Sequence, residues 1–170
     1  GASKWSLLRL LCPITCGCAD PRSGLMFRVQ SEGCPVHACQ GTPAYLAALD
    51  KVECRDSTPD ELKVLPAWHL FFQHLLNYTW LHQRPQVQAI VNNLLEVGCA
   101  GIPIAYTNTM HFNFCQAREA SAARPGIASL RAFCPITCDC PNKMDEIVSN
   151  GMSERHDCPS ACYNTTRATP

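Results

Sequence analysis

The cysteines of this chain recur as a block, and that block constrains the fold more than any other feature. Residues 130–140, LRAFCPITCDC, return almost letter for letter at 8–18 as LRLLCPITCGC. Five cysteines recur in the same order, at offsets of 122 to 124 residues: Cys12, Cys16, Cys18, Cys34 and Cys39 in the first block, and Cys134, Cys138, Cys140, Cys158 and Cys162 in the second. A repeat with its flanks preserved predicts a chain built from similar units.

The three remaining cysteines, Cys54, Cys99 and Cys115, lie between the two blocks. In the register of the repeat, the first block's counterparts of Cys99 and Cys115 fall before residue 1, and the second block's counterpart of Cys54 falls near position 176. We therefore interpret the chain as about one and a half turns of a unit of about 122 residues, with eight cysteines in one complete unit.

The composition narrows the class of protein. The formal net charge is zero and the pI is near 7.1, which argues against a nucleic-acid binder. Hydrophobic residues make up 46% of the chain, so we expect a real core that disulfides assist rather than replace. We find no apolar run long enough for a membrane span and no signal peptide, as expected for a mature secreted protein.

The 13 cysteines allow two readings, disulfides in an oxidising compartment or metal ligands and free thiols in a reducing one. The chain has no Cys-x-x-Cys pair, and Cys-x3-Cys-x-Cys crowds three sulfurs for one tetrahedral zinc site. Two N-glycosylation sequons begin at Asn77 and Asn164. Together these features predict disulfides at the cysteines, N-linked glycans at both asparagines, and no metal or cofactor. The odd count leaves at least one cysteine unpaired or paired outside this chain.

The expected fold is mainly α: small disulfide-rich helical modules in tandem around a central helical segment. We place a first cysteine block at 1–45, the helical segment at 46–98 and a second cysteine block at 99–170. These boundaries follow the change from cysteine-rich to apolar helical sequence.

The central segment carries clear helix signals. Thr58 is the expected N-cap of a helix that begins at Pro59, with Glu61 closing a capping box. Pro66 begins an apolar helix that we expect to form the core and to run through 83. A third helix opens at Pro85 and ends at Gly98 as its C-cap.

The cysteine blocks contain shorter elements. The sequence predicts helices over 4–11 and 126–133, each running into a Cys-Pro pair, because the residue before proline avoids the α region. A further short helix is expected to start at Pro43, and another over 111–123. Residues 101–106 read as a loop or a short strand.

The stretch SLRAFCPITCDC resembles the C-terminal half of ShK-type toxin modules, where a short helix runs into Cys-Pro-x-Thr/Ser-Cys-Gly-x-Cys. On this resemblance Cys134, Cys138 and Cys140 match the last three cysteines of that family. The form CPxTCGC followed by GCPxxC also resembles cysteine-rich repeats in secreted proteins of dinoflagellate algae. The resemblance implies a disulfide module. It departs from the ShK pattern in its final spacing and in its second Cys-Pro pair, and no channel-blocking Lys-Tyr pair can be placed.

The sequence contains no residue pattern that indicates an enzyme active site. Three histidines lie on the apolar helix, at His69, His74 and His82. Their spacings of five and eight residues do not place a zinc-binding pair on one helix face, so we assign them to helix packing or the surface. No nucleophile elbow, phosphate loop or dinucleotide fingerprint is present. The three tryptophans could stack on sugars, although core packing is the favoured interpretation: Trp5, Trp68 and Trp80.

We therefore expect an extracellular structural or interaction module, a segment of a longer repetitive disulfide-rich glycoprotein that forms filaments or surfaces. Its expected partners are neighbouring copies or another extracellular protein, and its location is the secreted or cell-surface compartment. The alternatives are an accessory subunit on the lumenal side of a large complex, or a secreted enzyme or ligand-binding protein. If each block is a closed unit, the first block must take its missing partners from a neighbouring chain or from upstream sequence, and such head-to-tail contacts build filaments.

Overall fold

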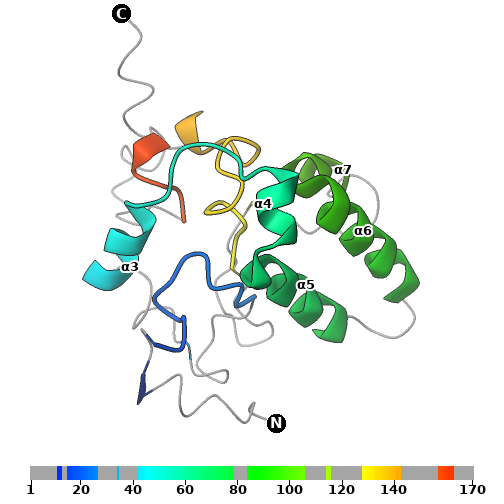
Figure 1. The fold of residues 1–170 in the computed structure, drawn as a ribbon, viewed down its shortest axis with the longest axis horizontal. Helices are drawn as coiled ribbons and strands as arrows, with labels where there is room; N and C mark the ends of the chain where they lie inside the picture. The colour runs from blue at the N-terminus through cyan, green and yellow to red at the C-terminus, as the bar shows by residue number, and fades with distance from the viewer. Residues whose placement is uncertain are drawn as a thin grey trace, which may run out of the picture.

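The computed structural model describes residues 11–12, 15–26, 34, 42–78, 84–105, 114–115, 128–142 and 157–162, without the side chains of 84, 104 and 105. All regular secondary structure in these ranges is helical, so the fold is mainly α as predicted. The elements are α3 (Pro43–Leu49), α4 (Pro59–Lys63), α5 (Pro66–Tyr78), α6 (Arg84–Val97), the 3₁₀ helix η2 (Gly98–Gly101) and α7 (Ile102–Ala105) (Figure 1).

Helices α3 and α4 begin where the sequence predicts. Thr42 caps α3 by accepting a hydrogen bond from the Tyr45 amide. Thr58 accepts from the Glu61 amide while the Glu61 carboxylate accepts from the Thr58 amide, so the predicted capping box is present. In both helices proline takes the first position, where a missing N–H costs nothing.

Helices α5 and α6 lie beside α4 and run in roughly opposite directions (Figure 1). The three helices pack on one another. Helix α5 begins at Pro66 as predicted; its expected extension over 79–83 lies outside the described residues. Gly98 ends α6 with a φ of +66°, a left-handed conformation that glycine adopts at little cost. A Cβ there would lie 3.0 Å from the side chain of Leu62, so packing also favours glycine.

The expectation of a loop or strand at 101–106 is wrong for its described part. The chain instead continues from η2 directly into α7. Pro103 lies in the first turn of α7, where proline is tolerated, and the buried Ile102 packs into the core. The short apolar run thus reads as a strand but is held as a helical turn by tertiary packing.

The expected helix at 126–133 is also wrong over the described residues, which form turns. The backbone amide of Leu130 donates to the Phe114 carbonyl, and the amide of Arg131 donates to the Ser129 hydroxyl. These partners outside the helical pattern replace the bonds that a regular helix would make. The expected helix at 4–11 lies almost wholly outside the described residues, as does most of that at 111–123, where Phe114 and Cys115 lie in a turn.

One main core joins helices α4, α5, α6 and α7 to the second cysteine block. Trp68 lies fully buried at its centre, with edge-on contacts to Phe72 and Phe133 at centroid distances of 4.9 and 5.5 Å. Its burial confirms core packing for this tryptophan; Trp5 and Trp80 lie outside the described residues. The core also takes Met26 from the first cysteine block. No helix of the described ranges is long and apolar enough to cross a membrane.

Candidate functional site

Five disulfides connect the described segments: Cys18–Cys34, Cys54–Cys162, Cys99–Cys134, Cys115–Cys138 and Cys140–Cys158. The last four use eight cysteines and enclose the chain from position 54 to position 162. That span is a closed set: each of its cysteines pairs within it. The remaining disulfide lies in the first block and joins the two positions that correspond to Cys140 and Cys158 in the repeat.

The second CPITC turn is compact, and its three cysteines are buried, whereas Ile136 and Asp139 are exposed. The amide of Cys138 donates to the Cys134 carbonyl at 2.9 Å, and the amide of Cys140 donates to the Pro135 carbonyl at 2.9 Å. Asp139 closes the turn with a φ of +58°. The three sulfurs therefore leave one tight turn toward three different segments, which explains why the motif places them four and two residues apart.

Asp56 holds this turn from a segment far away in sequence. Its carboxylate accepts from the Ile136 amide at 2.8 Å, from the Thr137 amide at 3.1 Å and from the Thr137 hydroxyl at 2.6 Å. The amide of Ser57 also donates to the Phe133 carbonyl at 2.9 Å. Residues 54–58 thus lie along 133–137 and fix the turn from one side. The sequence offered no signal for this role, because Asp56 lies about 80 residues away from its partners.

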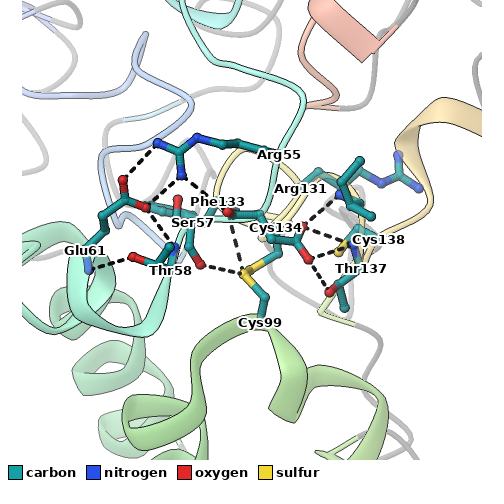
Figure 2. The surroundings of a disulfide bond; sticks show 12 residues. Arg55, Ser57, Thr58, Glu61, Cys99, Arg131, Phe133, Cys134, Thr137 and Cys138 are labelled. Carbon is teal, nitrogen blue, oxygen red and sulfur yellow. Dashed lines mark hydrogen bonds and ion pairs between the residues drawn. A yellow bond between two sulfur atoms is a disulfide. The ribbon is translucent and has the colours of Figure 1, made fainter. Parts of the chain in front are cut away.

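The Cys99–Cys134 disulfide lies at the point where these segments meet η2 (Figure 2). The Cys99 sulfur contacts two backbone carbonyl oxygens, that of Ser57 at 3.7 Å and that of Phe133 at 3.6 Å. A disulfide sulfur has no hydrogen to donate, so these are packing contacts. Figure 2 shows the α4 cap on one side of this disulfide and the CPITC turn on the other.

The α4 cap is reinforced by charge. Arg55 donates two hydrogen bonds to the Glu61 carboxylate, at 2.8 and 2.9 Å (Figure 2). It donates a third to the Glu53 carboxylate. The hydrogen bonds from Arg55 and from the Thr58 amide lower the pKa of Glu61 from 4.5 to about 2. The carboxylate is therefore ionised at any ordinary pH and holds the cap in place.

The first cysteine block is docked on this framework through Arg22 and Met26. The Arg22 guanidinium lies 5.1 Å from the centroid of the Phe133 ring and donates to the Ser57 hydroxyl at 3.1 Å. Burial lowers its pKa, although nearby acidic groups partly offset this. The Met26 carbonyl accepts from the Ala128 amide at 2.8 Å. These contacts join residues of the first block to those of the second.

A buried carboxylate ties α3 to the second block. Asp157, with a φ of +68°, accepts hydrogen bonds from the Tyr45 hydroxyl and, at 2.8 Å, from the Ser129 hydroxyl. Both donors are neutral, and both oxygens of the carboxylate are used. Arg131 lies two residues after Ser129, and burial of its guanidinium lowers its pKa. The negative charge of Asp139 opposes that shift. The network explains how α3, outside the main core, is held in place.

The two CPITC turns share their local geometry. In the first, the amide of Cys16 donates to the Cys12 carbonyl at 3.0 Å, as Cys138 does to Cys134. Gly17 has a φ of +79° at the position of Asp139. Over the described residues, the two copies of the motif thus share this hydrogen bond and a left-handed conformation at the position before the third cysteine.

The surroundings of the two turns differ. Leu11 is 68% exposed, whereas Phe133 at the same position in the repeat is 1% exposed. Cys12 is exposed and Cys16 half-buried, and both are free thiols, whereas Cys134 and Cys138 are buried in disulfides. The odd count of thirteen predicts at least one cysteine without a partner in this chain, and Cys12 and Cys16 are two such cysteines. Cys39 lies outside the described residues.

The other predicted site residues are dispersed. Asn77 is exposed in the last turn of α5, and Asn164 lies outside the described residues. The His69 ring nitrogen Nε2 hydrogen-bonds the Lys63 carbonyl at 2.8 Å, which assigns it to the end of α4. His74 lies half-buried in α5, and His82 is outside the described ranges. Across the described ranges, no group of three or more His, Cys, Asp or Glu side chains is placed to hold a metal ion.

Comparisons with family models, with curated proteins and with solved structures gave no match to this chain. The disulfides are therefore the feature from which we infer function. Five disulfides are typical of a protein from an oxidising, extracellular environment.

Proposed function

We propose that this chain is an extracellular structural or interaction module, a segment of a longer repetitive disulfide-rich glycoprotein. The observation that carries the proposal is the closed set of four disulfides between Cys54 and Cys162. Such a set cross-links every described segment of the unit to another. The carboxylates of Asp56 and Asp157 accept hydrogen bonds that hold the folded chain together.

Repetition is supported by the first block. The disulfide Cys18–Cys34 occupies the repeat positions of Cys140–Cys158. The turn before it has the equivalent backbone hydrogen bond and a left-handed conformation at the equivalent position, Gly17 in place of Asp139. A repeating unit of this kind needs neighbours to bury its faces, as other repeat proteins do. On this proposal the first block is the closing part of one unit, docked on the unit that follows.

N-linked glycans belong to the same proposal. Asn77 is exposed on α5, on the side away from the buried residues Phe71, Phe72 and Leu75. A glycan there would extend into solvent without disturbing the core. Removal of that sequon by Asn77→Gln is therefore expected to abolish one glycan and to leave the fold unchanged.

The test uses the protein in its source. An antibody against residues 1–170 should detect a species of more than 18.7 kDa outside the cells, and N-glycosidase treatment should increase its gel mobility. Alkylation before lysis should leave the cysteines between positions 54 and 162 unmodified. A cytosolic location with these cysteines fully alkylated would contradict the proposal. A discrete secreted protein of about this mass would keep the extracellular module and refute the longer repeat.

A further inference from the structure

We propose that Leu11, Cys12 and Cys16 form a docking site for another unit of the same kind, linked to it by two disulfides. The proposal rests on the repetitive module proposed above and names its junction. Cys12 is assigned to the partner unit's counterpart of Cys99, and Cys16 to its counterpart of Cys115.

The pairing follows from the second copy of the motif. There, Cys134 bonds to Cys99 and Cys138 bonds to Cys115. Cys12 corresponds to Cys134, and Cys16 corresponds to Cys138. The partners that the first copy lacks are therefore the counterparts of Cys99 and Cys115. The cysteines that would bond to them, Cys12 and Cys16, are the two free thiols.

The turn is already shaped for this partner. The Cys16–Cys12 backbone hydrogen bond and the left-handed Gly17 reproduce the conformation that presents Cys134 and Cys138 to their partners. The two thiols are accessible, since Cys12 is exposed and Cys16 half-buried.

The apolar surface beside the thiols fits the same occupant. Leu11 is 68% exposed, while Phe133 at its repeat position is buried in the core beside Trp68. Thr15 is exposed, while Thr137 donates to the Asp56 carboxylate. A second unit would therefore supply a core to receive Leu11, a carboxylate for Thr15 and two thiols for Cys12 and Cys16.

The chemistry of the link is ordinary disulfide formation. Each bond joins two thiols, which lose two protons and two electrons. The electrons pass to a disulfide oxidant of the secretory pathway by thiol–disulfide exchange, and that oxidant leaves as a dithiol. Two such exchanges complete the junction and consume four thiols.

The test adds the missing partner in register. A duplicate of residues 46–122 placed directly before Gly1 brings one more copy each of Cys54, Cys99 and Cys115, which raises the cysteine count from thirteen to sixteen. The new links would then close the same spans, 35 and 23 residues, as the disulfides already present. An Ala100→Ser change at an exposed position in the duplicate marks its Cys99 peptide.

Peptide mapping after alkylation is expected to show Cys12 bonded to the marked Cys99 peptide and Cys16 bonded to a Cys115 peptide, with neither Cys12 nor Cys16 alkylated. The matched control is the same extended chain with Cys12→Ser and Cys16→Ser, which should expose two alkylated cysteines in the duplicate. Free Cys12 and Cys16 beside an intact Cys54–Cys162 set would overturn the proposal, because the downstream unit reports that the chain has folded.

A second arm needs no engineered chain. In protein from its source, alkylated before extraction, Cys12 and Cys16 should be found bonded to peptides that lie outside residues 1–170. Thiols at both positions, or a bond between them, would refute the docking site while the unit's own disulfides stay intact. Loss of those disulfides as well would instead refute the extracellular module itself.

Discussion

Replacement of Asp56 by alanine should destabilise the protein more than any other single change at a surface carboxylate in the described ranges. The substitution removes the acceptor for the Ile136 amide, the Thr137 amide and the Thr137 hydroxyl. Hydrogen bonds to charged groups contribute about 1.5–3 kcal/mol each in favourable cases. Asp56 is half-buried and Ile136 is exposed, so water replaces part of this, and we expect a loss of about 2–3 kcal/mol.

That loss corresponds to a fall in melting temperature of about 4–12 °C for a chain of this size. Denaturant unfolding under non-reducing conditions measures it directly. The matched control is Asp60→Ala, because the Asp60 side chain is 97% exposed and should change stability by less than about 0.5 kcal/mol. A double-mutant cycle with Thr137→Val should give a coupling of about 1 kcal/mol or more. Equal effects of the two aspartate substitutions would refute the role of Asp56 in holding the CPITC turn.

Three further predictions follow from other parts of the structure. Leu94→Ala, at a fully buried position of α6, should cost about 2–5 kcal/mol in denaturant unfolding, whereas Val64→Ala, at a position 81% exposed, should cost little; equal costs would place α6 outside the core. The folded pKa of Glu61 lies below its unfolded value, so its contribution to the α4 cap is complete above about pH 4.5 and disappears as pH falls through about 2, a dependence that NMR titration should show in the protein and not in Glu61→Gln. Gly24→Ala would place a Cβ 2.0 Å from the Ala67 carbonyl oxygen at a φ of +72°, so it should release the first block and accelerate proteolysis within 15–26; unchanged cleavage would contradict the docking.

The features that could be predicted from the sequence are those that local chemistry decides. The capping box at Thr58 and Glu61 depends on residues three apart, and the stop at Gly98 depends on one backbone conformation. Proline at the first position of α3 and α4 acts in the same local way. Each of these was predicted correctly because no distant partner enters the argument.

The features that could not be predicted depend on distant partners. The turn at 128–133 carries a helical pattern, but the Leu130 amide donates to the distant Phe114 carbonyl, and the Ser129 hydroxyl, which Asp157 holds, accepts from the Arg131 amide. The role of Asp56 also depends on a distant partner, because Thr137 lies 81 residues away in the sequence. Eight cysteines in one unit allow about a hundred pairings, so the connectivity had to come from the structure.

The repeat gave the most information about the site. It identified Cys12 and Cys16 as equivalents of Cys134 and Cys138 before any pairing was known. The structure added what the alignment of the blocks does not contain, that the equivalents differ in burial and in bonding. The difference lies in what surrounds the turn, since the turns themselves are alike.

The central claim, that positions 54 to 162 form one closed disulfide unit, is tested most directly by the disulfide map of residues 1–170 expressed in an oxidising compartment. Rapid alkylation, proteolysis without reduction and mass spectrometry should recover four linked pairs: Cys54–Cys162, Cys99–Cys134, Cys115–Cys138 and Cys140–Cys158. Cys12 and Cys16 should carry the alkyl group. A stable, homogeneous protein in which Cys99 or Cys115 is bonded to a cysteine of the first block would contradict the account.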